Sequence, residues 1–303
     1  MIETAVRSEF WTWQGYRIRY QQAGERGPAL LLIHGFGASS DHWRKNLPDL
    51  GEGHQVFALD LLGFGQSDKP TPCQPHAYTF ETWGAIAVRF CREVIQAPAF
   101  FVGNSIGCVV ALQAAVDDPE FCRGVVMIDC SLRLLHVRKR RTLPWYRSAT
   151  APILQRLLDV RPLGEFFFAQ LATKRSLRRI LRQAYGRKEA VTDELLTLLL
   201  EPAFSPGALD VFLAFIKYDE GPLAEDLLPQ LSCPILILWG EEDPWEPIEL
   251  ARQEYEAQPG VERFVSLPRL GHCPQDEAPE IVDPLISEWV AEVVSRSSAP
   301  DMC

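Results

Sequence analysis

The stretch Ala99-Phe-Phe-Val-Gly-Asn-Ser-Ile-Gly-Cys108 decides the fold of this 303-residue chain. Its first four residues are an apolar run, which indicates a buried strand. The residues after Ser105 lead into an Ala-, Val- and Leu-rich segment that ends at Asp117 and favours a helix. A serine between two glycines at such a strand-to-helix junction is typical of a nucleophile elbow, in which a tight turn raises the hydroxyl above the sheet. The pattern is weak alone and needs partners elsewhere in the chain.

Strands and helices alternate on both sides of this stretch. Apolar runs and turn residues predict strands at 29–33, 56–59, 99–102, 124–128, 234–239 and 263–267, with an N-terminal hairpin at 10–22. Capping residues and helical spacing predict helices at 39–47, 79–96, 106–117 and 280–294. The alternation predicts an α/β fold with a mainly parallel sheet flanked by helices. In such a fold, functional loops lie at the carboxyl ends of the strands.

One block of the chain breaks the alternation. Residues 133–222 contain helix-like segments interrupted by prolines and no clear strand. We interpret this block as a helical cap inserted into the α/β core, over the strand ends where a site would lie. The predicted domains are therefore a core formed by 1–132 and 223–303 and a cap formed by 133–222.

The charge of the chain is unevenly distributed. The cap holds 16 Lys and Arg against 9 Asp and Glu, a net charge of +7, so the rest of the chain carries −17. Its basic residues gather at 138–141 and 174–182, close to aromatic side chains. Two interpretations stay open: peripheral association with an anionic membrane, or a solvated face of a cap helix. The total of −10 argues against nucleic acid as a partner.

Four motifs occur in one order along the chain: His34-Gly-Phe-Gly37, Gly103–Gly107, Trp239-Gly-Glu-Glu-Asp243 and Gly271-His272. By these motifs the chain resembles the α/β-hydrolases over nearly its whole length. The resemblance implies a Ser-His-Asp triad with Ser105 as nucleophile, His272 as general base and Asp243 as the acid. It also implies that the backbone N–H groups of Phe36 and Ile106 form the oxyanion hole.

The identity of the acid leaves alternatives. Asp243 occupies the motif position and is followed by Pro244, a turn-former, but Glu241, Glu242 and Asp129 can also be considered. A serine nucleophile favours acyl transfer on an ester, thioester or amide, whereas the similar haloalkane dehalogenases and epoxide hydrolases use aspartate. This chemistry requires no cofactor and no metal. The eight cysteines are scattered without metal-ligand spacing, as expected for buried thiols.

Several longer segments carry a closer resemblance. HGFGASSDHWRKN, DLLGFGQSDKP, VGNSIGCVVALQAA, MIDCSLRLLHVRKR and LWGEEDPWEP are similar to the chlorophyll dephytylase and pheophytinase group. This resemblance implies a serine esterase that hydrolyses the phytyl ester of chlorophyll or pheophytin and releases phytol. Cys108 departs from the group, where many members have a second glycine. The first residues lack a signal or transit peptide, so we expect a cyanobacterial protein on the cytoplasmic side, not secreted, and at the thylakoid surface if the cap binds lipid.

Aromatic and apolar cap residues are candidates for the substrate cleft. They are Leu143, Trp145, Tyr146, Phe166, Phe167 and Phe168. Ordinary core packing is the alternative interpretation of the same residues. Two other functions also fit the motifs: a general carboxylesterase acting on small or lipidic esters, and a slow-turnover hydrolase that serves as a ligand receptor.

Overall fold

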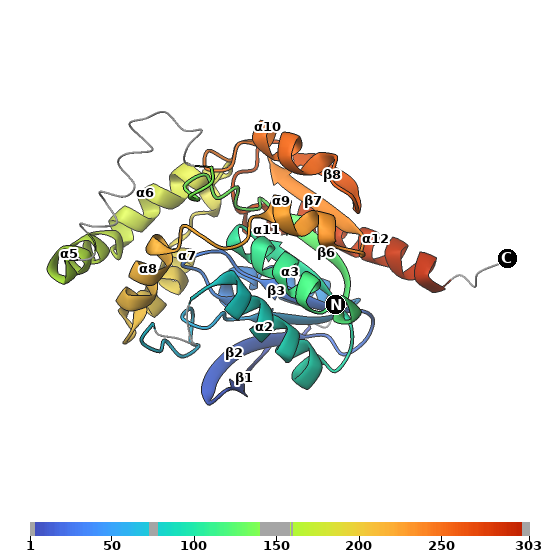
Figure 1. Ribbon diagram of the computed structural model, residues 1–303, viewed down its shortest axis with the longest axis horizontal. Helices are drawn as coiled ribbons and strands as arrows, with labels where there is room; N and C mark the ends of the chain where they lie inside the picture. The colour runs from blue at the N-terminus through green and yellow to red at the C-terminus, as the bar shows by residue number, and fades with distance from the viewer. Residues whose placement is uncertain (1–3, 73–77, 140–157, 159, 299–303) are drawn as a thin grey trace.

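The computed structural model describes residues 4–72, 78–139, 158 and 160–298 (Figure 1). In this part of the chain one sheet has the strand order β1-β2-β4-β3-β5-β6-β7-β8. The strands are β1 Arg7–Trp13, β2 Tyr16–Ala23, β3 Ala29–Ile33, β4 Gln55–Leu59, β5 Ala99–Asn104, β6 Cys122–Ile128, β7 Ile235–Gly240 and β8 Val261–Leu267. The pairs β1–β2 and β2–β4 are antiparallel and all others are parallel. The expected α/β fold is confirmed.

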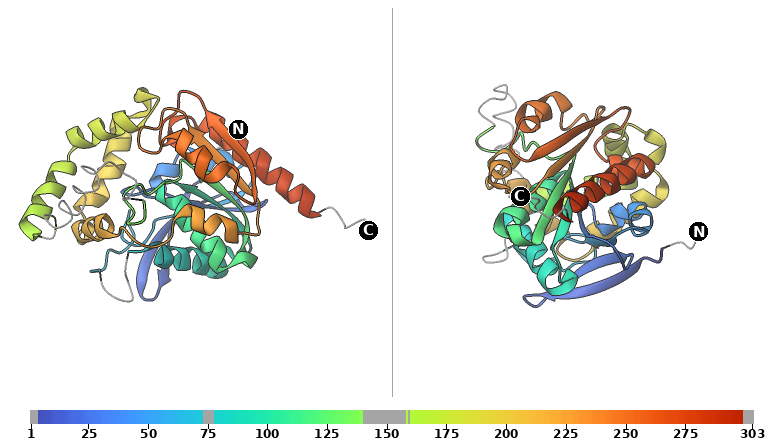
Figure 2. Two further views of the ribbon diagram at one scale, coloured as in Figure 1. Left: turned by 45° about the horizontal axis from the view of Figure 1, so that its top comes forward. Right: turned by 90° about the vertical axis from the view of Figure 1, so that its right-hand side faces the viewer.

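Helices cover both faces of the sheet (Figure 2). One face carries α2 Phe80–Phe90, continued by the π-helical turn Cys91–Ile95, with α3 Ile106–Asp117, α9 Ala224–Leu227 and α10 Ile248–Ala251. The other face carries α1 Asn46–Leu50 and α12 Pro279–Ser298, next to the short α11 Pro274–Glu277. The site-bearing loops therefore stand on strands that are held from both sides.

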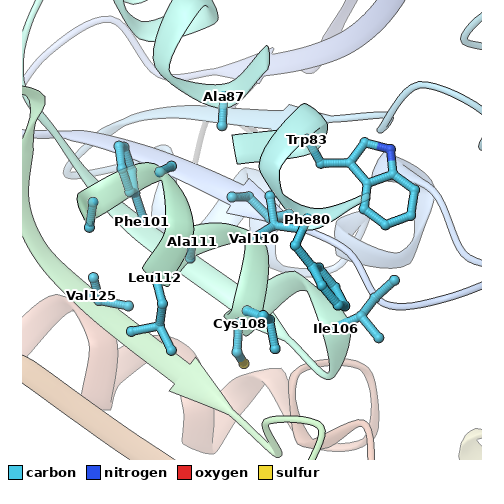
Figure 3. Close-up of a cluster of buried hydrophobic side chains, with 14 of the residues drawn as sticks. Phe80, Trp83, Ala87, Phe101, Ile106, Cys108, Val110, Ala111, Leu112 and Val125 are labelled. Atoms are coloured by element: carbon cyan, nitrogen blue, oxygen red, sulfur yellow. The ribbon is translucent and has the colours of Figure 1, made fainter. Parts of the chain in front are cut away.

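The alternation of side chains along the strands creates two cores. Leu31 and Ile33 of β3 pack with the helices on the first face, whereas Leu30 and Leu32 pack with Trp289 and the helices on the second. Figure 3 shows side chains of α2 and α3 meeting above β5 in the first core. Because α3 is buried nearly throughout, the helix that follows Ser105 has little freedom to move.

Between β6 and β7 the described residues form helices and no strand. Before α9, which packs against the sheet, they are α5 Arg161–Leu171, α6 Lys174–Ala184, α7 Asp193–Leu200 and α8 Ala208–Lys217, with 3-10 turns at Lys188–Ala190 and Glu201–Phe204. These helices lie together at one end of the molecule, opposite the end that α12 reaches (Figures 1 and 2). Leu143, Trp145 and Tyr146 lie outside the described residues.

No single helix among the described residues is long and apolar enough to cross a bilayer. The stretches Asp193–Phe204 and Ala208–Lys217 reach the necessary length only as a pair, and they are bent by 93° at the break between them.

Candidate active site

Ser105 occupies a strained turn between β5 and α3. Its backbone has φ 56° and ψ −122°, a region that residues other than glycine rarely adopt. The turn is so close that a Cβ on Gly103 would lie 2.4 Å from the Gly107 carbonyl, and one on Gly107 would lie 2.3 Å from the Ile33 carbonyl. Both glycines are therefore required by backbone contact, as the elbow motif predicts.

His272 and Asp243 meet beside the elbow, although 29 residues separate them. Their atoms Nδ1 and Oδ2 are 2.6 Å apart, and both side chains are buried. The other oxygen of Asp243 accepts hydrogen bonds from the backbone N–H groups of Trp245 at 2.8 Å and Glu246 at 3.2 Å. The carboxylate is thus fixed in one orientation and directs the Nδ1 proton of His272 toward itself.

The electrostatics of His272 suit a general base. Burial alone would lower its pKa, but the hydrogen bond and negative charge of Asp243 outweigh burial and raise the pKa above the ordinary 6.5. With the proton on Nδ1, the Nε2 atom is left with a lone pair. Ser105 and His272 line the same cavity, so this arrangement can remove a proton from the serine hydroxyl during attack.

Asp129, the alternative acid, lies behind Asp243. It is fully buried, and its carboxyl oxygens accept the Gly240 N–H at 3.0 and 3.2 Å. Burial raises the pKa of Asp129 well above its usual range, and the charge of Asp243 raises it further. Because two adjacent carboxylates cannot both ionise cheaply, burial and the neighbouring Asp243 favour the neutral form of Asp129. Neither Glu241 nor Glu242 takes the place beside His272, since both are exposed.

In the described part of the chain, the two aspartates and His272 form a cluster with metal-ligand spacing. Ligand atoms of Asp129, Asp243 and His272 lie within 4.8 Å of one another. However, the direct contact of Asp243 with His272 engages the atoms that a metal would need. Hydrogen bonds from His272 and Asp129 to Asp243 account for this cluster. The expectation that the protein needs no cofactor stays a prediction.

The loop after β3 brings Phe36 to the elbow. His34, buried within it, accepts the Leu61 N–H at Nε2 and donates its Nδ1–H to the Gly35 carbonyl, so its role is to shape the loop. The ring of Phe36 stacks on Phe215 of α8 at 4.5 Å. Ile106 opens α3, and its N–H has no carbonyl partner within that helix.

A cavity of about 500 Å³ connects these parts. Its floor is made by Ser105, His272 and the Phe36 loop, and its roof by apolar side chains of the cap helices. The roof residues include Phe168, Leu171, Leu177, Ile180, Leu181, Leu199, Leu200, Val211, Phe212 and Phe215. Such a site accepts a mainly apolar molecule and presents its polar centre to the serine.

The three cap phenylalanines differ in position. Phe168 lines the cavity, whereas Phe167 packs against Phe212 at 6.3 Å and Phe166 is 66% exposed. Of the three, Phe168 is therefore the one that lines the cavity, and a flanking role of Phe166 and Phe167 stays a prediction. Successive residues of a helix point in different directions, so three adjacent aromatics cannot share one face.

Sequence reasoning missed the way the cap supports the histidine loop. The backbone N–H of His272 donates to the Ala184 carbonyl at the end of α6, at 2.9 Å. The hydroxyl of Tyr185 lies between His42 Nε2, 3.0 Å away, and Asp276 Oδ2, 3.1 Å away. No motif marks these contacts, because they join segments that are far apart in sequence.

Sequence reasoning also missed the two residues Trp245 and Glu246, which lie close to Asp243 in the sequence. Trp245 meets the His272 ring edge-on at 5.0 Å and lines the cavity. Glu246 also lines it and accepts hydrogen bonds from the Ser131 hydroxyl and the Leu132 N–H, both at 3.0 Å. Burial raises the pKa of Glu246 to about 7. The Trp-Glu pair that follows Asp243 and Pro244 was the available signal.

Comparison with known proteins agrees with this geometry. The sequence profile of the alpha/beta hydrolase fold matches residues 28–279. The chain is 26% identical to chloroplastic pheophytinase of Arabidopsis thaliana over 92% of its own length, and it spans only 65% of that protein. It is 27% identical to the uncharacterized hydrolase YugF of Bacillus subtilis, covering 92% of this chain and 93% of YugF.

Among solved structures, the epoxide hydrolase CorEH superposes with a TM-score of 0.77 at 21% identity, covering 95% of this chain and all of that one. At this level of identity, the likeness concerns the fold alone. The matched profile covers more than four fifths of the sequence, including the elbow, the acid loop and the histidine loop. The chain is a member of the alpha/beta hydrolase fold family.

Proposed function

We propose that this hydrolase is a serine esterase in which Ser105, His272 and Asp243 form the catalytic triad. His272 takes the hydroxyl proton as Ser105 attacks the ester carbonyl, and the N–H groups of Phe36 and Ile106 stabilise the oxyanion. The protonated His272 then gives that proton to the departing alcohol, leaving an acyl-enzyme. Water, deprotonated by the same histidine, releases the acid and restores the serine.

The substrate that we propose is the phytyl ester of chlorophyll or pheophytin. The observation that carries this proposal is the apolar roof of the cavity directly above the triad, which offers a surface for a long hydrocarbon chain. A cavity of about 500 Å³ is too small for the whole pigment, so the flat ring would lie at its mouth while the ester reaches Ser105. Similarity to a pheophytinase along 92% of this chain supports the same substrate.

The test compares chlorophyll, pheophytin and a short p-nitrophenyl ester in the same detergent. We expect kcat/KM for at least one pigment to exceed that for the short ester, with phytol as a product. Efficient cleavage of the short ester with both pigments left intact would show a general carboxylesterase. A single turnover followed by retention of the product would indicate a slow hydrolase that serves as a receptor.

A matched pair of variants tests the apolar roof. Phe168 lines the cavity and Phe166, two residues earlier, is exposed. We expect Phe168→Ser to lower kcat/KM for the phytyl ester by about tenfold or more, because it places a hydroxyl against the chain. Phe166→Ser should leave this value unchanged in detergent. An equal effect of both substitutions would show that the cavity does not determine specificity.

A further inference from the structure

The outer face of α6 is strongly basic. This helix carries Lys174, Arg175, Arg178, Arg179 and Arg182 and no acidic residue. Its opposite face, with Leu177, Ile180 and Leu181, roofs the cavity, so the basic residues point away from the core. All four arginines and Gln183 line an open depression on this outer face.

Among the described residues, most of these cations have no carboxylate partner. Arg178 pairs with Asp193. Within the described residues, no ion pair joins the side chains of Lys174, Arg175, Arg179 or Arg182 to an acid, and all four are exposed. Unpaired cations on one helix face repel each other, so an anionic surface that neutralises them is favourable.

The neighbouring helix α5 presents an apolar stripe. Val160, Leu163 and Phe166 recur every three residues and are 51%, 45% and 66% exposed, respectively. Phe168 and Leu171 of the same helix line the cavity, whereas the three stripe residues do not line it and are exposed to solvent. Figure 1 shows α5 and α6 as neighbours at the end of the molecule that is farthest from the C-terminus. Exposed apolar side chains beside clustered cations are typical of membrane-surface helices.

We propose that the outer faces of α5 and α6 form a docking surface for a membrane that contains anionic phospholipids. The cations contact the headgroups, and the stripe of Val160, Leu163 and Phe166 enters the interface between headgroups and acyl chains. A charge of −17 outside the cap against +7 within it makes the molecule approach such a membrane with the cap first. This proposal does not depend on the phytyl ester and holds for any substrate of the site.

The same two helices form both the docking surface and the roof of the cavity. Docking therefore places the cavity next to the lipid phase, so a lipidic ester can reach the serine after a short path. A nucleic acid would also attract the arginines, but it offers no apolar phase for the α5 stripe and would be repelled by the acidic remainder.

The experiment is flotation of the full chain with vesicles of phosphatidylcholine alone or mixed with phosphatidylglycerol. We expect binding to the mixed vesicles at low salt to be at least about tenfold tighter, and to weaken as added salt shortens the Debye length below about 8 Å. Inorganic phosphate at the same ionic strength as the chloride buffer should not displace the protein further. Equal binding to both vesicles, no binding to either, or selective displacement by phosphate would overturn the proposal.

A triple variant localises the interaction. Arg175→Gln, Arg179→Gln and Arg182→Gln together should weaken binding by roughly 10- to 100-fold, since each cation near the surface contributes up to about fivefold. The control triple removes three exposed arginines of the core, with Arg7→Gln, Arg26→Gln and Arg89→Gln. Hydrolysis of a soluble ester, measured in parallel, reports that each variant is folded. An equal loss of vesicle binding in both triples would show a net-charge effect and overturn the assignment to α6.

Leu163→Ser and Phe166→Ser together test the apolar stripe without a change of charge. We expect the double variant to bind mixed vesicles several-fold more weakly and to retain its salt dependence, because the cations remain. Unchanged binding would show that α5 is not part of the docking surface.

Discussion

Asp243→Asn is the most informative substitution at the site, because the surrounding hydrogen bonds dictate how asparagine must lie. The amide oxygen has to remain toward the N–H groups of Trp245 and Glu246. A flipped amide would leave two part-buried donors unpaired, at a cost of about 1 kcal/mol or more each. The amide N–H₂ group therefore faces His272 and donates to Nδ1.

Reversing the direction of the hydrogen bond at Nδ1 changes the tautomer of His272. With Nδ1 accepting, the ring proton resides on Nε2, which then cannot take the proton of Ser105. The lost rate is on the order of 10⁴-fold in kcat/KM, or roughly 5 kcal/mol of transition-state stabilisation. Steady-state hydrolysis of a soluble p-nitrophenyl ester gives the rate, and circular dichroism reports whether the fold is intact.

Asp129→Asn is the matched control. Burial raises the pKa of Asp129 and favours its neutral form, and asparagine preserves both an acceptor for the Gly240 N–H and a donor toward Asp243. Its positive φ of 44° is also compatible with asparagine. We expect less than about a tenfold loss. A crippled Asp129→Asn together with an active Asp243→Asn would refute the reasoning and make Asp129 the catalytic acid.

Three other predictions concern the nucleophile, the acid loop and the second core. Ser105→Ala should lower kcat by about 10⁶-fold and still bind pigment, measured by co-elution; normal turnover would end the serine mechanism. Glu246→Gln should move the acid limb of the kcat/KM profile to lower pH, because the charge of Glu246 raises the pKa of His272; an unmoved limb contradicts this. Burial raises the pKa of Asp283 to about 7, so the folded state loses stability as pH rises from about 4 to 7. Asp283→Asn should therefore stabilise the protein by roughly 2–4 kcal/mol above pH 7 and little near pH 4 in urea unfolding; equal gains at both would contradict it.

The sequence was sufficient for the elements whose signals are local. The central parallel strands β3, β5 and β7 are short apolar runs, and the elbow glycines are required by contacts within one turn and with the adjacent strand β3. Motif order was enough to expect Ser105, Asp243 and His272 at one edge of the sheet. The predicted starts of β6 and β8 are each two residues late. Cys122 and Val261, where these strands begin, precede the apolar runs that were used to locate them.

The cap could not be predicted to the same depth. Its helices are amphipathic, but sequence alone does not tell which of Phe166, Phe167 and Phe168 lines the cavity. Contacts such as Tyr185 with His42 and Asp276 join three segments whose separation in sequence exceeds 90 residues. Long-range polar pairs of this kind leave no periodic signal in the chain.

The bond from His272 to Ala184 limits how this enzyme can be re-engineered. Caps are the obvious parts to exchange when a hydrolase is to be given a new substrate, yet here the final residues of α6 hold the backbone of His272, the proposed general base. Arg187 adds a second attachment, with its N–H bound to Glu277 at 2.8 Å. A chimera that replaces the whole cap would remove both attachments. A chimera that returns to the native sequence before Ala184 keeps both attachments to the histidine loop. The boundary between exchangeable and indispensable sequence therefore lies inside the cap, at the last turn of α6.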